Sequence, residues 1–159
     1  RCCRRQRQMC IRDSSRSDTQ LCLEVVDLDL YQTLNGFVKK AFEQYTSVYS
    51  GILQNNDPVS TWTTKVQKTK AGGGYHQWHC ENGQFLYRDR VLAWMVYLNT
   101  VPSQSGGGTD FLHQKLTLQP EAGTIVLWPA SYTHVHRGGF LTGNVDKYIA
   151  TGWFIREPT

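Results

Sequence analysis

Histidines and a glutamate stand at spacings that could hold a metal ion. The stretch GGGYHQWHCENG contains His79 and Glu81 two positions apart, and the stretch THVHRGG contains His134 and His136. Residues two apart on a β-strand project their side chains to the same face. Two imidazoles and one carboxylate on one face are the ligand set that holds Fe(II) while leaving positions open for other ligands. His79, Glu81 and His136 fit this set.

The distal histidine is a choice between His134 and His136, because both lie on one face if THVHR is extended. The histidine that is not a ligand would line the pocket or orient a metal ligand through a hydrogen bond. His76 would face the opposite side of a strand from His79, and Cys80 is expected to fill core space rather than bind metal. A bare His-x-Glu pair occurs by chance in many chains, so whether it binds a metal must be judged from the secondary structure and motifs around it.

One region of the chain has the pattern of an amphipathic helix, from residue 27 to residue 49. Its apolar positions recur three and four residues apart: Leu30, Leu34, Phe37, Val38, Ala41, Phe42 and Tyr45.

The rest of the chain is typical of β structure. Short runs of Val, Ile, Thr, Trp and Tyr are separated by Gly, Pro and Asn. Short strands with no helical pattern between them favour a sandwich or jelly roll. A chain of 159 residues suits one domain around one core. The predicted strands cover residues 60–70, 75–81, 91–99, 109–119, 124–128, 132–137 and 147–155.

The opening segment carries the whole net charge of +4, because residues 1–14 hold five Arg and one Asp. Within it, MCIRDS can be encoded by a transposon-based sequencing adapter. We therefore expect residues 1–14 to be a non-native, disordered segment, and residues 15–159 to form the domain. A basic arm for nucleic acid is the alternative for this segment. The neutral remainder gives no reason to expect a nucleic-acid partner.

Cysteine and apolar content bear on the compartment. Outside the opening segment only Cys22 and Cys80 remain, too few for a disulfide framework, which favours a reducing cytoplasm. The longest uncharged apolar run, VLAWMVYL, is far shorter than the roughly 20 residues that cross a bilayer. We expect no membrane partner.

From Trp62 to Arg156 the sequence resembles the Fe(II)- and 2-oxoglutarate-dependent dioxygenases, most closely their prolyl 4-hydroxylase-like branch with its short phage and bacterial members. Five motifs stand in the family's order: GGGYHQWHCE, RVLAWMVYLN, GGGTDF, LQPEAGTIVLWP and HRGGFLTGNVDKYIATGWF. Several ordered motifs are far more specific than one His-x-Glu pair. The chief departure is Glu81, where most relatives carry Asp, and this glutamate is still expected to bind metal.

The resemblance implies a double-stranded β-helix with the N-terminal helical region packed on one sheet. It implies a catalytic Fe(II) held by His79, Glu81 and His136, with O2 and 2-oxoglutarate as cosubstrates and ascorbate as reductant. Lys147 follows His136 by 11 residues and His134 by 13. The shorter spacing is closer to the family's, which favours His136 as the distal ligand.

The far carboxylate of 2-oxoglutarate needs a cation in a mostly apolar pocket. Lys147 is the expected cation, on a strand face that it shares with Ile149, Thr151 and Trp153. By resemblance, Thr151 and Trp153 line this pocket and the phenol of Tyr97 assists the carboxylate.

Two arginines are weaker candidates for the same cation. Arg90 stands at the start of its strand, and Arg137 should face away from His136. We rank both below Lys147.

The implied activity is hydroxylation of an aliphatic C–H, with a prolyl residue of a peptide or protein as the leading substrate. A shared fold says little about substrate, so free amino acids and other peptide residues stay open. A cupin-like module that binds a metal or small molecule without oxidising anything is the first alternative. A virion or host-surface interaction domain is the second. If the protein is phage-encoded, the cytoplasm is that of the host cell.

Overall fold

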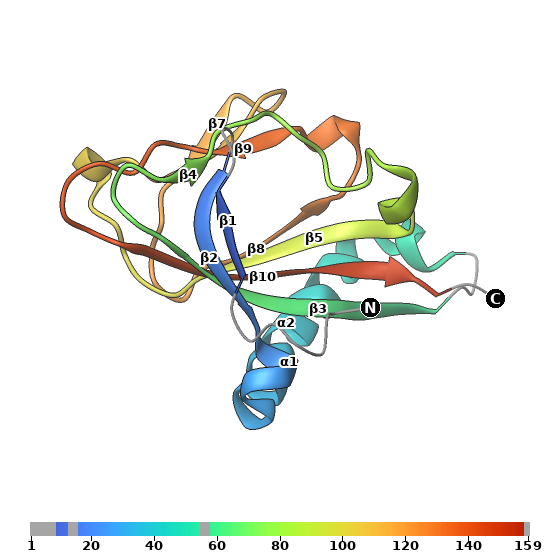
Figure 1. Cartoon of the computed structure of the whole chain (residues 1–159). Helices are drawn as coiled ribbons and strands as arrows, with labels where there is room; N and C mark the ends of the chain where they lie inside the picture. The colour runs from blue at the N-terminus through green and yellow to red at the C-terminus, as the bar shows by residue number, and fades with distance from the viewer. Residues whose placement is uncertain (1–8, 13–15, 55–57, 158–159) are drawn as a thin grey trace.

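Two antiparallel sheets face each other and form the body of the molecule (Figure 1). The computed structural model describes residues 9–12, 16–54 and 58–157. In this part of the chain the larger sheet has the order β1-β2-β3-β10-β5-β8, with β4 paired to β2, and the smaller sheet has the order β7-β6-β9. This arrangement confirms the predicted mainly-β sandwich.

The strands have the following bounds. The larger sheet contains β1 (Met9–Arg12), β2 (Arg16–Cys22), β3 (Val59–Thr69), β4 (Gly74–Tyr75), β5 (Arg90–Tyr97), β8 (Ile125–Pro129) and β10 (Lys147–Arg156). The smaller sheet contains β6 (Thr109–Phe111), β7 (Leu116–Leu118) and β9 (His136–Gly138). Short 3₁₀ helices are η1 (Ser50–Leu53), η2 (Phe85–Tyr87), η3 (Ser103–Ser105) and η4 (Tyr132–His134).

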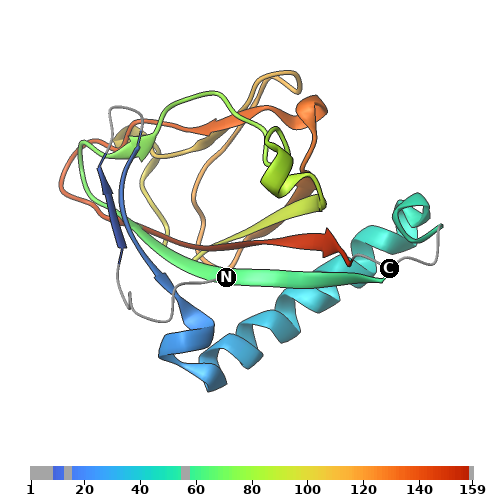
Figure 2. The ribbon, with the colours of Figure 1, turned by 45° about the vertical axis from the view of Figure 1, so that its right-hand side comes forward.

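The predicted helix is confirmed as α2 (Leu28–Val48), which follows the short α1 (Leu23–Val26). It begins where the Asp27 carboxylate accepts a hydrogen bond of 2.9 Å from the Leu30 N–H, because a carboxylate at this position satisfies an otherwise unpaired donor. Figure 2 shows α2 crossing the outer face of the larger sheet, on the side away from the smaller sheet. The helix therefore covers one face of the sheet and leaves the other face for a site.

Only part of the predicted apolar stripe of α2 is buried. Val38 is fully buried, and Leu34, Phe42 and Tyr45 pack around it against the sheet. Leu30 and Phe37 were expected in the same stripe but are 52% and 54% exposed. At 3.6 residues per turn, both project about 80–100° from the direction of Val38. They therefore lie beside the contact rather than in it.

The central strands β5 and β10 separate two hydrophobic clusters. Leu92, Trp94 and Val96 of β5 face α2, whereas Ala93, Met95 and Tyr97 face the space between the sheets. The alternation follows from the strand period of two. Side chains on the inner face of these strands are therefore the ones that can line a cavity between the sheets.

Several predicted strands are shorter than expected or are interrupted. The strand predicted over 75–81 is confined to Gly74–Tyr75, and the chain then forms turns in which residue 79 makes an isolated bridge. The strand predicted over 109–119 is the β6–β7 hairpin, with Lys115 at φ 52°. Residues 132–134 are helical, so THVHR is not extended throughout. The turn within 109–119 joins two strands of the smaller sheet, whereas residues 132–134 lie where the chain passes from β8 of the larger sheet to β9 of the smaller sheet.

The sequence pattern also missed structure near the start of the chain. Strand β2 and helix α1 were not predicted, and residues 9–12 form β1, paired antiparallel with β2, rather than the expected disordered segment. Backbone pairing with β2 supplies hydrogen bonds that the composition of these residues did not suggest. Residues 1–8 and 13–14 of the expected segment lie outside the described residues, and its adapter origin stays a prediction.

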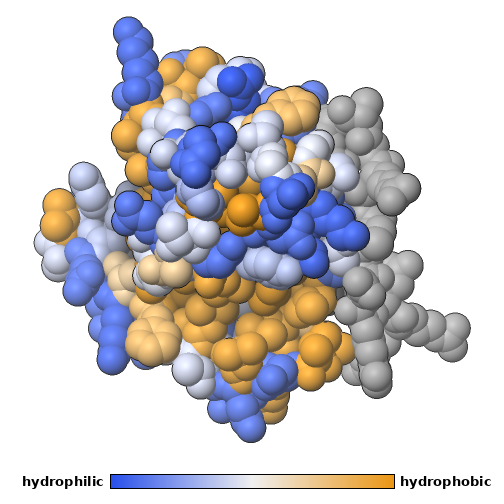
Figure 3. Space-filling model, turned by 90° about the vertical axis from the view of Figure 1, so that its left-hand side faces the viewer, coloured by the Kyte–Doolittle hydropathy of each residue, from blue (hydrophilic) through white to orange (hydrophobic). Residues whose placement is uncertain are grey.

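Exposed apolar side chains gather around the helices. On the face in Figure 3, hydrophobic residues occupy the lower half, at the level of α1 and α2, and the upper half is mostly hydrophilic. Val25, Val26 and Leu28 are between 50% and 57% exposed. None of the helices in the described ranges is long and apolar enough to cross a membrane.

A β-bulge between β3 and β10 brings Trp62 to the inner face of the sheet. Gly152 pairs with Thr64 and Trp153 pairs with Trp62, so Thr63 has no partner in this register. Thr63 has φ 57°, a conformation that costs a β-branched residue about 1–2 kcal/mol. A Cβ at Gly152 would collide with the Thr63 carbonyl and lie 2.6 Å from the Trp94 ring. The bulge thus depends on a glycine opposite a strained threonine.

Gly152→Ala should lower the free energy of unfolding by about 1–3 kcal/mol, because neither the carbonyl nor the buried ring can move aside cheaply. Thr63→Gly should not destabilise the protein, since it relieves the positive φ. Urea denaturation of both variants and the wild type measures this. A neutral Gly152→Ala would show that the two strands do not approach as closely as described.

Candidate active site

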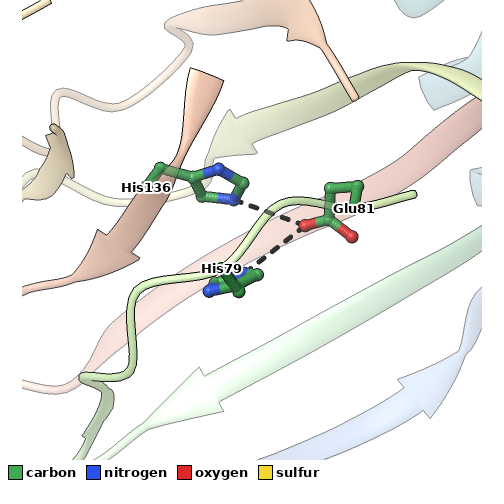
Figure 4. Close-up of side chains that lie close together, drawn as sticks. All are labelled: His79, Glu81 and His136. Atoms are coloured by element: carbon green, nitrogen blue, oxygen red, sulfur yellow. Dashed lines mark ion pairs between the residues drawn. The ribbon is translucent and has the colours of Figure 1, made fainter. Parts of the chain in front are cut away.

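Three side chains converge between the two sheets: His79, Glu81 and His136 (Figure 4). Nε2 of His136 lies 3.3 Å from Oε1 of Glu81, and Nε2 of His79 lies 3.6 Å from the same oxygen. The three potential ligand atoms all lie within 4.8 Å of one another. The structure therefore brings together the three residues that the sequence singled out. The histidine that lies beside His79 and Glu81 is His136.

Backbone hydrogen bonds, rather than a continuous strand, position these residues. The N–H of His79 donates to the carbonyl of His136 at 3.0 Å, and the N–H of His136 donates back to the carbonyl of His79 at 2.9 Å. The N–H of Glu81 donates to the carbonyl of Ala130, just after β8, at 2.9 Å. The proximity of His79 and Glu81 was predicted from strand alternation, but a looped segment held to β9 and β8 produces it.

The two imidazoles have the same orientation relative to their own backbone. Nδ1 of His79 lies 2.9 Å from the carbonyl oxygen of Gln77, and Nδ1 of His136 lies 2.9 Å from that of His134. A carbonyl oxygen can only accept, so each Nδ1 carries a proton, and Nε2 is the nitrogen that donates to Glu81 when it is protonated and offers a lone pair to a metal when it is not. In both residues the nitrogen that can bind a metal is thus the one beside Glu81.

His134 does not join this group. Its own Nδ1 is bonded to the hydroxyl of Thr133 at 3.0 Å, and it is not one of the residues that line the cavity. Burial lowers the pKa of His134, with smaller contributions from the nearby His136 and His113. The part of His134 that orients His136 is its backbone carbonyl, so the side chain is not needed for that role.

Glu81 stays ionised despite its burial. Burial by itself would raise the pKa of this carboxyl, but hydrogen bonds and charges from His136 and His79 outweigh it and hold the pKa below the usual range. Its second oxygen, Oε2, accepts a hydrogen bond of 2.8 Å from Nε1 of Trp153 and one of 3.2 Å from Nη1 of Arg90. The carboxylate is therefore available as an anionic ligand.

The cavity beside these residues has a volume of about 320 Å³. The predicted face of β10 lines it, with Lys147, Ile149, Thr151 and Trp153 all contributing. Other parts of the wall include residues that the sequence did not single out: Lys65, Gln67 and Thr69 of the neighbouring strand β3, Thr109 of β6, and Tyr75 and Tyr87. Cys80, expected in the core, is a half-buried free thiol that also lines the cavity, because the chain around it turns instead of forming a strand.

Lys147 lies at the first position of β10 and is only 6% exposed. Its Nζ donates a hydrogen bond of 2.7 Å to the carbonyl of Gly107, an uncharged acceptor. Burial lowers the pKa of Lys147 from its usual 10.5 to about 8, and the charge of Asp18 opposes this only in part. A buried ammonium group on a cavity wall, with its hydrogen bond to a carbonyl rather than to a carboxylate, is suited to an anionic ligand.

Of two further residues predicted to contact the cosubstrate, Thr151 lines the cavity and Tyr97 does not. Thr151 lines the cavity, and its hydroxyl donates to the carbonyl of Trp94 at 2.7 Å. Tyr97 is fully buried and lies outside the cavity lining. Its hydroxyl bonds to Oγ1 of Thr109 at 2.8 Å and to the carbonyl of Leu118 at 3.3 Å. Tyr97 thus orients Thr109, the residue that lines the cavity.

The remaining histidine and arginine near the site have structural contacts. His76 bonds to the carbonyl of Gly138 at 3.0 Å and stacks on Phe140, as expected of a residue that faces away from the ligands. Arg137 points away from His136 and pairs with Asp110 at 3.0 Å. Neither residue competes with Lys147 for an anion in the cavity.

The donor set fits Fe(II). Two imidazole nitrogens and one ionised carboxylate oxygen are the ligands of non-heme iron oxygenases and also of some catalytic zinc sites, whereas Mg²⁺ and Ca²⁺ prefer oxygen alone and structural zinc prefers thiolates. The buried Lys147 on the same cavity wall fits a second anionic group beside such a metal.

Comparison with known proteins agrees with this geometry. Residues 64–155 match the family model described as the 2OG-Fe(II) oxygenase superfamily. No curated protein matches the chain in sequence.

Solved structures with a similar fold include prolyl hydroxylases. A viral collagen prolyl hydroxylase from Paramecium bursaria Chlorella virus-1 is 21% identical with a TM-score of 0.67, covering 90% of this chain and 81% of that one. A prolyl-4-hydroxylase from Pseudomonas putida is 19% identical with a TM-score of 0.70, covering 95% and 78%. A Trichoplax adhaerens prolyl hydroxylase, solved with a hypoxia inducible factor peptide fragment, is 17% identical with a TM-score of 0.73, covering 92% and 66%. These likenesses confirm the predicted double-stranded β-helix.

Proposed function

Because this chain belongs to the 2OG-Fe(II) oxygenase superfamily, we propose that it is a hydroxylase that binds Fe(II) through His79, Glu81 and His136 and binds 2-oxoglutarate through Lys147. The observation that carries this proposal is the convergence of three ligand atoms within 4.8 Å on the wall of a cavity that also contains a buried lysine. When bound, the iron and 2-oxoglutarate supply the oxidising chemistry: O2 and 2-oxoglutarate convert a C–H to C–OH, with succinate and CO2 as the other products.

The chain's own residues bind, orient and exclude water. Lys147 pairs with the far carboxylate of 2-oxoglutarate, and the pairing is strong because the ammonium group is desolvated. Ile149 and Trp153 supply apolar surface on the same wall, and Thr151 adds a hydroxyl. Tyr97 acts indirectly, by holding the hydroxyl of Thr109 at the cavity wall.

The substrate we propose is a prolyl residue of a peptide or protein. Tyr87 and Gln84 line the cavity next to the 3₁₀ helix η2, and Phe85 and Leu86 of η2 are 76% and 80% exposed. Aromatic surfaces of this kind suit proline-rich peptides, which are extended before they bind. The similarity of the fold to prolyl hydroxylases supports the same choice.

The proposal extends to the reductant and to the cellular compartment. Fe(II) must be kept reduced between turnovers, and ascorbate is the reductant we propose. Outside residues 1–14 the sequence has two cysteines, Cys22 and Cys80, too few for a disulfide framework, which supports a reducing compartment such as the cytoplasm.

With Fe(II), ascorbate and 2-oxoglutarate present, the protein should form succinate faster when a suitable proline-containing peptide is added. A panel of peptides should be compared by succinate release and by the gain of one oxygen atom in mass spectrometry. A peptide set in which proline is replaced by alanine is the control. Equal turnover with the alanine set would contradict the prolyl substrate but not the oxygenase activity.

Metal affinity should distinguish the two distal histidines. His79→Ala and His136→Ala should each abolish tight Fe(II) binding, whereas His134→Ala should leave it nearly unchanged, because His134 orients His136 through its backbone carbonyl. Anaerobic titration against a chelator measures the dissociation constants. A larger loss in His134→Ala than in His136→Ala would reverse the assignment.

Lys147 should make cosubstrate binding depend on pH. With Mn(II) in place of iron, 2-oxoglutarate at a hundredfold excess over its dissociation constant should stabilise the protein by about 2.7 kcal/mol. As the pH rises above about 8, free Lys147 loses its proton, and affinity should fall towards tenfold per pH unit until the pKa of the bound state is reached. Thermal unfolding with and without 2-oxoglutarate between pH 7 and pH 9.5 measures the shift.

The matched controls are Lys147→Arg and Lys147→Ala. The guanidinium keeps its charge, so Lys147→Arg should show a smaller shift that does not change with pH. Lys147→Ala should lose most of the shift and keep metal binding. A full shift in Lys147→Ala would place the cosubstrate elsewhere, and no shift in the wild type would favour a binding module that does not use 2-oxoglutarate.

A further inference from the structure

We propose that Arg90 and Trp153 are positioning residues that hold Glu81 in one orientation, so that only its Oε1 oxygen is offered to the metal. This inference rests on the proposed function, because it assumes that Glu81 is a metal ligand. It goes beyond that function by naming the residues that orient the longer side chain of a glutamate at a position where most relatives carry aspartate.

The two carboxylate oxygens of Glu81 have different partners. Oε1 lies 3.3 Å from Nε2 of His136 and 3.6 Å from Nε2 of His79. Oε2 accepts the hydrogen bonds from the Trp153 indole at 2.8 Å and from the Arg90 guanidinium at 3.2 Å. One oxygen therefore faces the ligand nitrogens while the other is occupied by N–H donors.

Arg90 holds the backbone of Glu81 as well as its side chain. The same Nη1 donates to the backbone carbonyl of Glu81 at 3.2 Å, and the N–H of Glu81 is bonded to Ala130. Because Glu81 lies in a turn and not in a strand, these contacts take the place of the strand-pairing hydrogen bonds that would otherwise fix the direction of its side chain. The residue is thus held at its N–H, its carbonyl and one carboxylate oxygen.

Arg90 is itself fixed by the rings around it. Its guanidinium carbon lies 3.7 Å from the ring centroid of Trp153 and 3.9 Å from that of Tyr87. The residue is 8% exposed and begins the central strand β5. A planar guanidinium between aromatic faces has little rotational freedom, so it can hold the carboxylate without losing much further entropy on metal binding.

The need for such a device follows from the length of glutamate. Compared with aspartate, glutamate has one more rotatable bond, and ordering it costs conformational entropy. A carboxylate with two unengaged oxygens can also bind a metal through both of them. A second coordinating oxygen would occupy one of the open positions that a 2-His-1-carboxylate site must keep for other ligands. Hydrogen bonds to Oε2 restrict the glutamate side chain before a metal binds, which lowers the entropy cost. They also keep Oε2 from becoming a second metal ligand.

Two variants test the proposal by removing the donors with little loss of volume. Trp153→Phe removes the indole N–H and keeps an aromatic ring, and Arg90→Met removes the guanidinium and keeps an unbranched apolar side chain. Each should weaken Co(II) or Fe(II) binding about 10- to 100-fold, the usual effect of losing a group that orients a ligand. Arg90→Lys keeps one charged donor and should recover part of the loss.

A spectroscopic readout separates positioning from general support of the fold. Infrared difference spectra between metal-free and metal-loaded protein report whether a carboxylate binds through one oxygen or two, from the separation of its two stretching bands. The wild type should show the wide separation of one-oxygen binding, and Trp153→Phe should shift towards the narrow separation of two-oxygen binding. A purely structural role for Trp153 would not change these bands.

The matched control is Trp62→Phe. Trp62 also lies near Arg90, with its ring centroid 5.6 Å from the guanidinium carbon, and it is not one of the donors to Glu81. This variant should leave both metal affinity and the carboxylate bands unchanged, and circular dichroism should show that every variant is folded.

The outcomes distinguish this inference from the function it rests on. If the wild type binds metal and loses it in His79→Ala, but Trp153→Phe and Arg90→Met change neither the affinity nor the bands, the positioning role is wrong and the metal site stands. If wild-type metal binding is absent or does not depend on His79, the proposed function itself fails.

Discussion

The reciprocal pair of backbone hydrogen bonds between His79 and His136 is the contact on which the site depends. It joins the loop after β4, which belongs to the larger sheet, to β9 of the smaller sheet. The bond pair fixes the distance between the two main chains, and each imidazole is then turned by a carbonyl two residues earlier in the chain. Side-chain geometry here is a consequence of main-chain pairing, which explains how two histidines far apart in sequence lie beside the same carboxylate without sharing a strand.

The inner face of β10 supplies the second constraint. Its alternation places Ala150 and Phe154 against α2 and leaves Lys147, Thr151 and Trp153 on the cavity side. The same strand therefore helps to form the hydrophobic core and carries both the cation at one end of the cavity and the donor to Glu81 at the other. Because β10 is paired with β3 along its length and with β5 from Ile149 onward, the separation between Lys147 and Trp153 is set by the strand rise and not by loop conformation.

The sequence predicted those features that depend on local period and missed those that depend on distant contacts. The cavity face of β10 follows from a period of two, and α2 follows from a period of 3.6, so both could be predicted. The role of Arg90 could not, because its partners Glu81 and Trp153 are brought to it only by the turn after His79 and the pairing of β10 with β5. A charged residue directly before the buried run VLAWMVY was the one available signal. Tyr97 was predicted to contact the cosubstrate directly, but its hydroxyl bonds to Thr109, a contact that depends on the position of the smaller sheet and could not be predicted from local period.

The two buried cations of the cavity illustrate why burial alone does not define a site. Arg90 faces the carboxylate of Glu81 and three aromatic rings, so its charge is compensated within the chain. Lys147 is equally buried but donates to a carbonyl, and burial lowers its pKa to about 8. Below that pH the folded state carries a poorly compensated charge, since the unfolded chain would hold the same proton more tightly. An anion bound beside Lys147, as the proposed function requires, would remove this penalty and so raise the stability of the folded protein. A buried ammonium group hydrogen-bonded to a carbonyl rather than to a carboxylate, in a cavity that also contains His79, Glu81 and His136, supports the proposal that Lys147 anchors the cosubstrate.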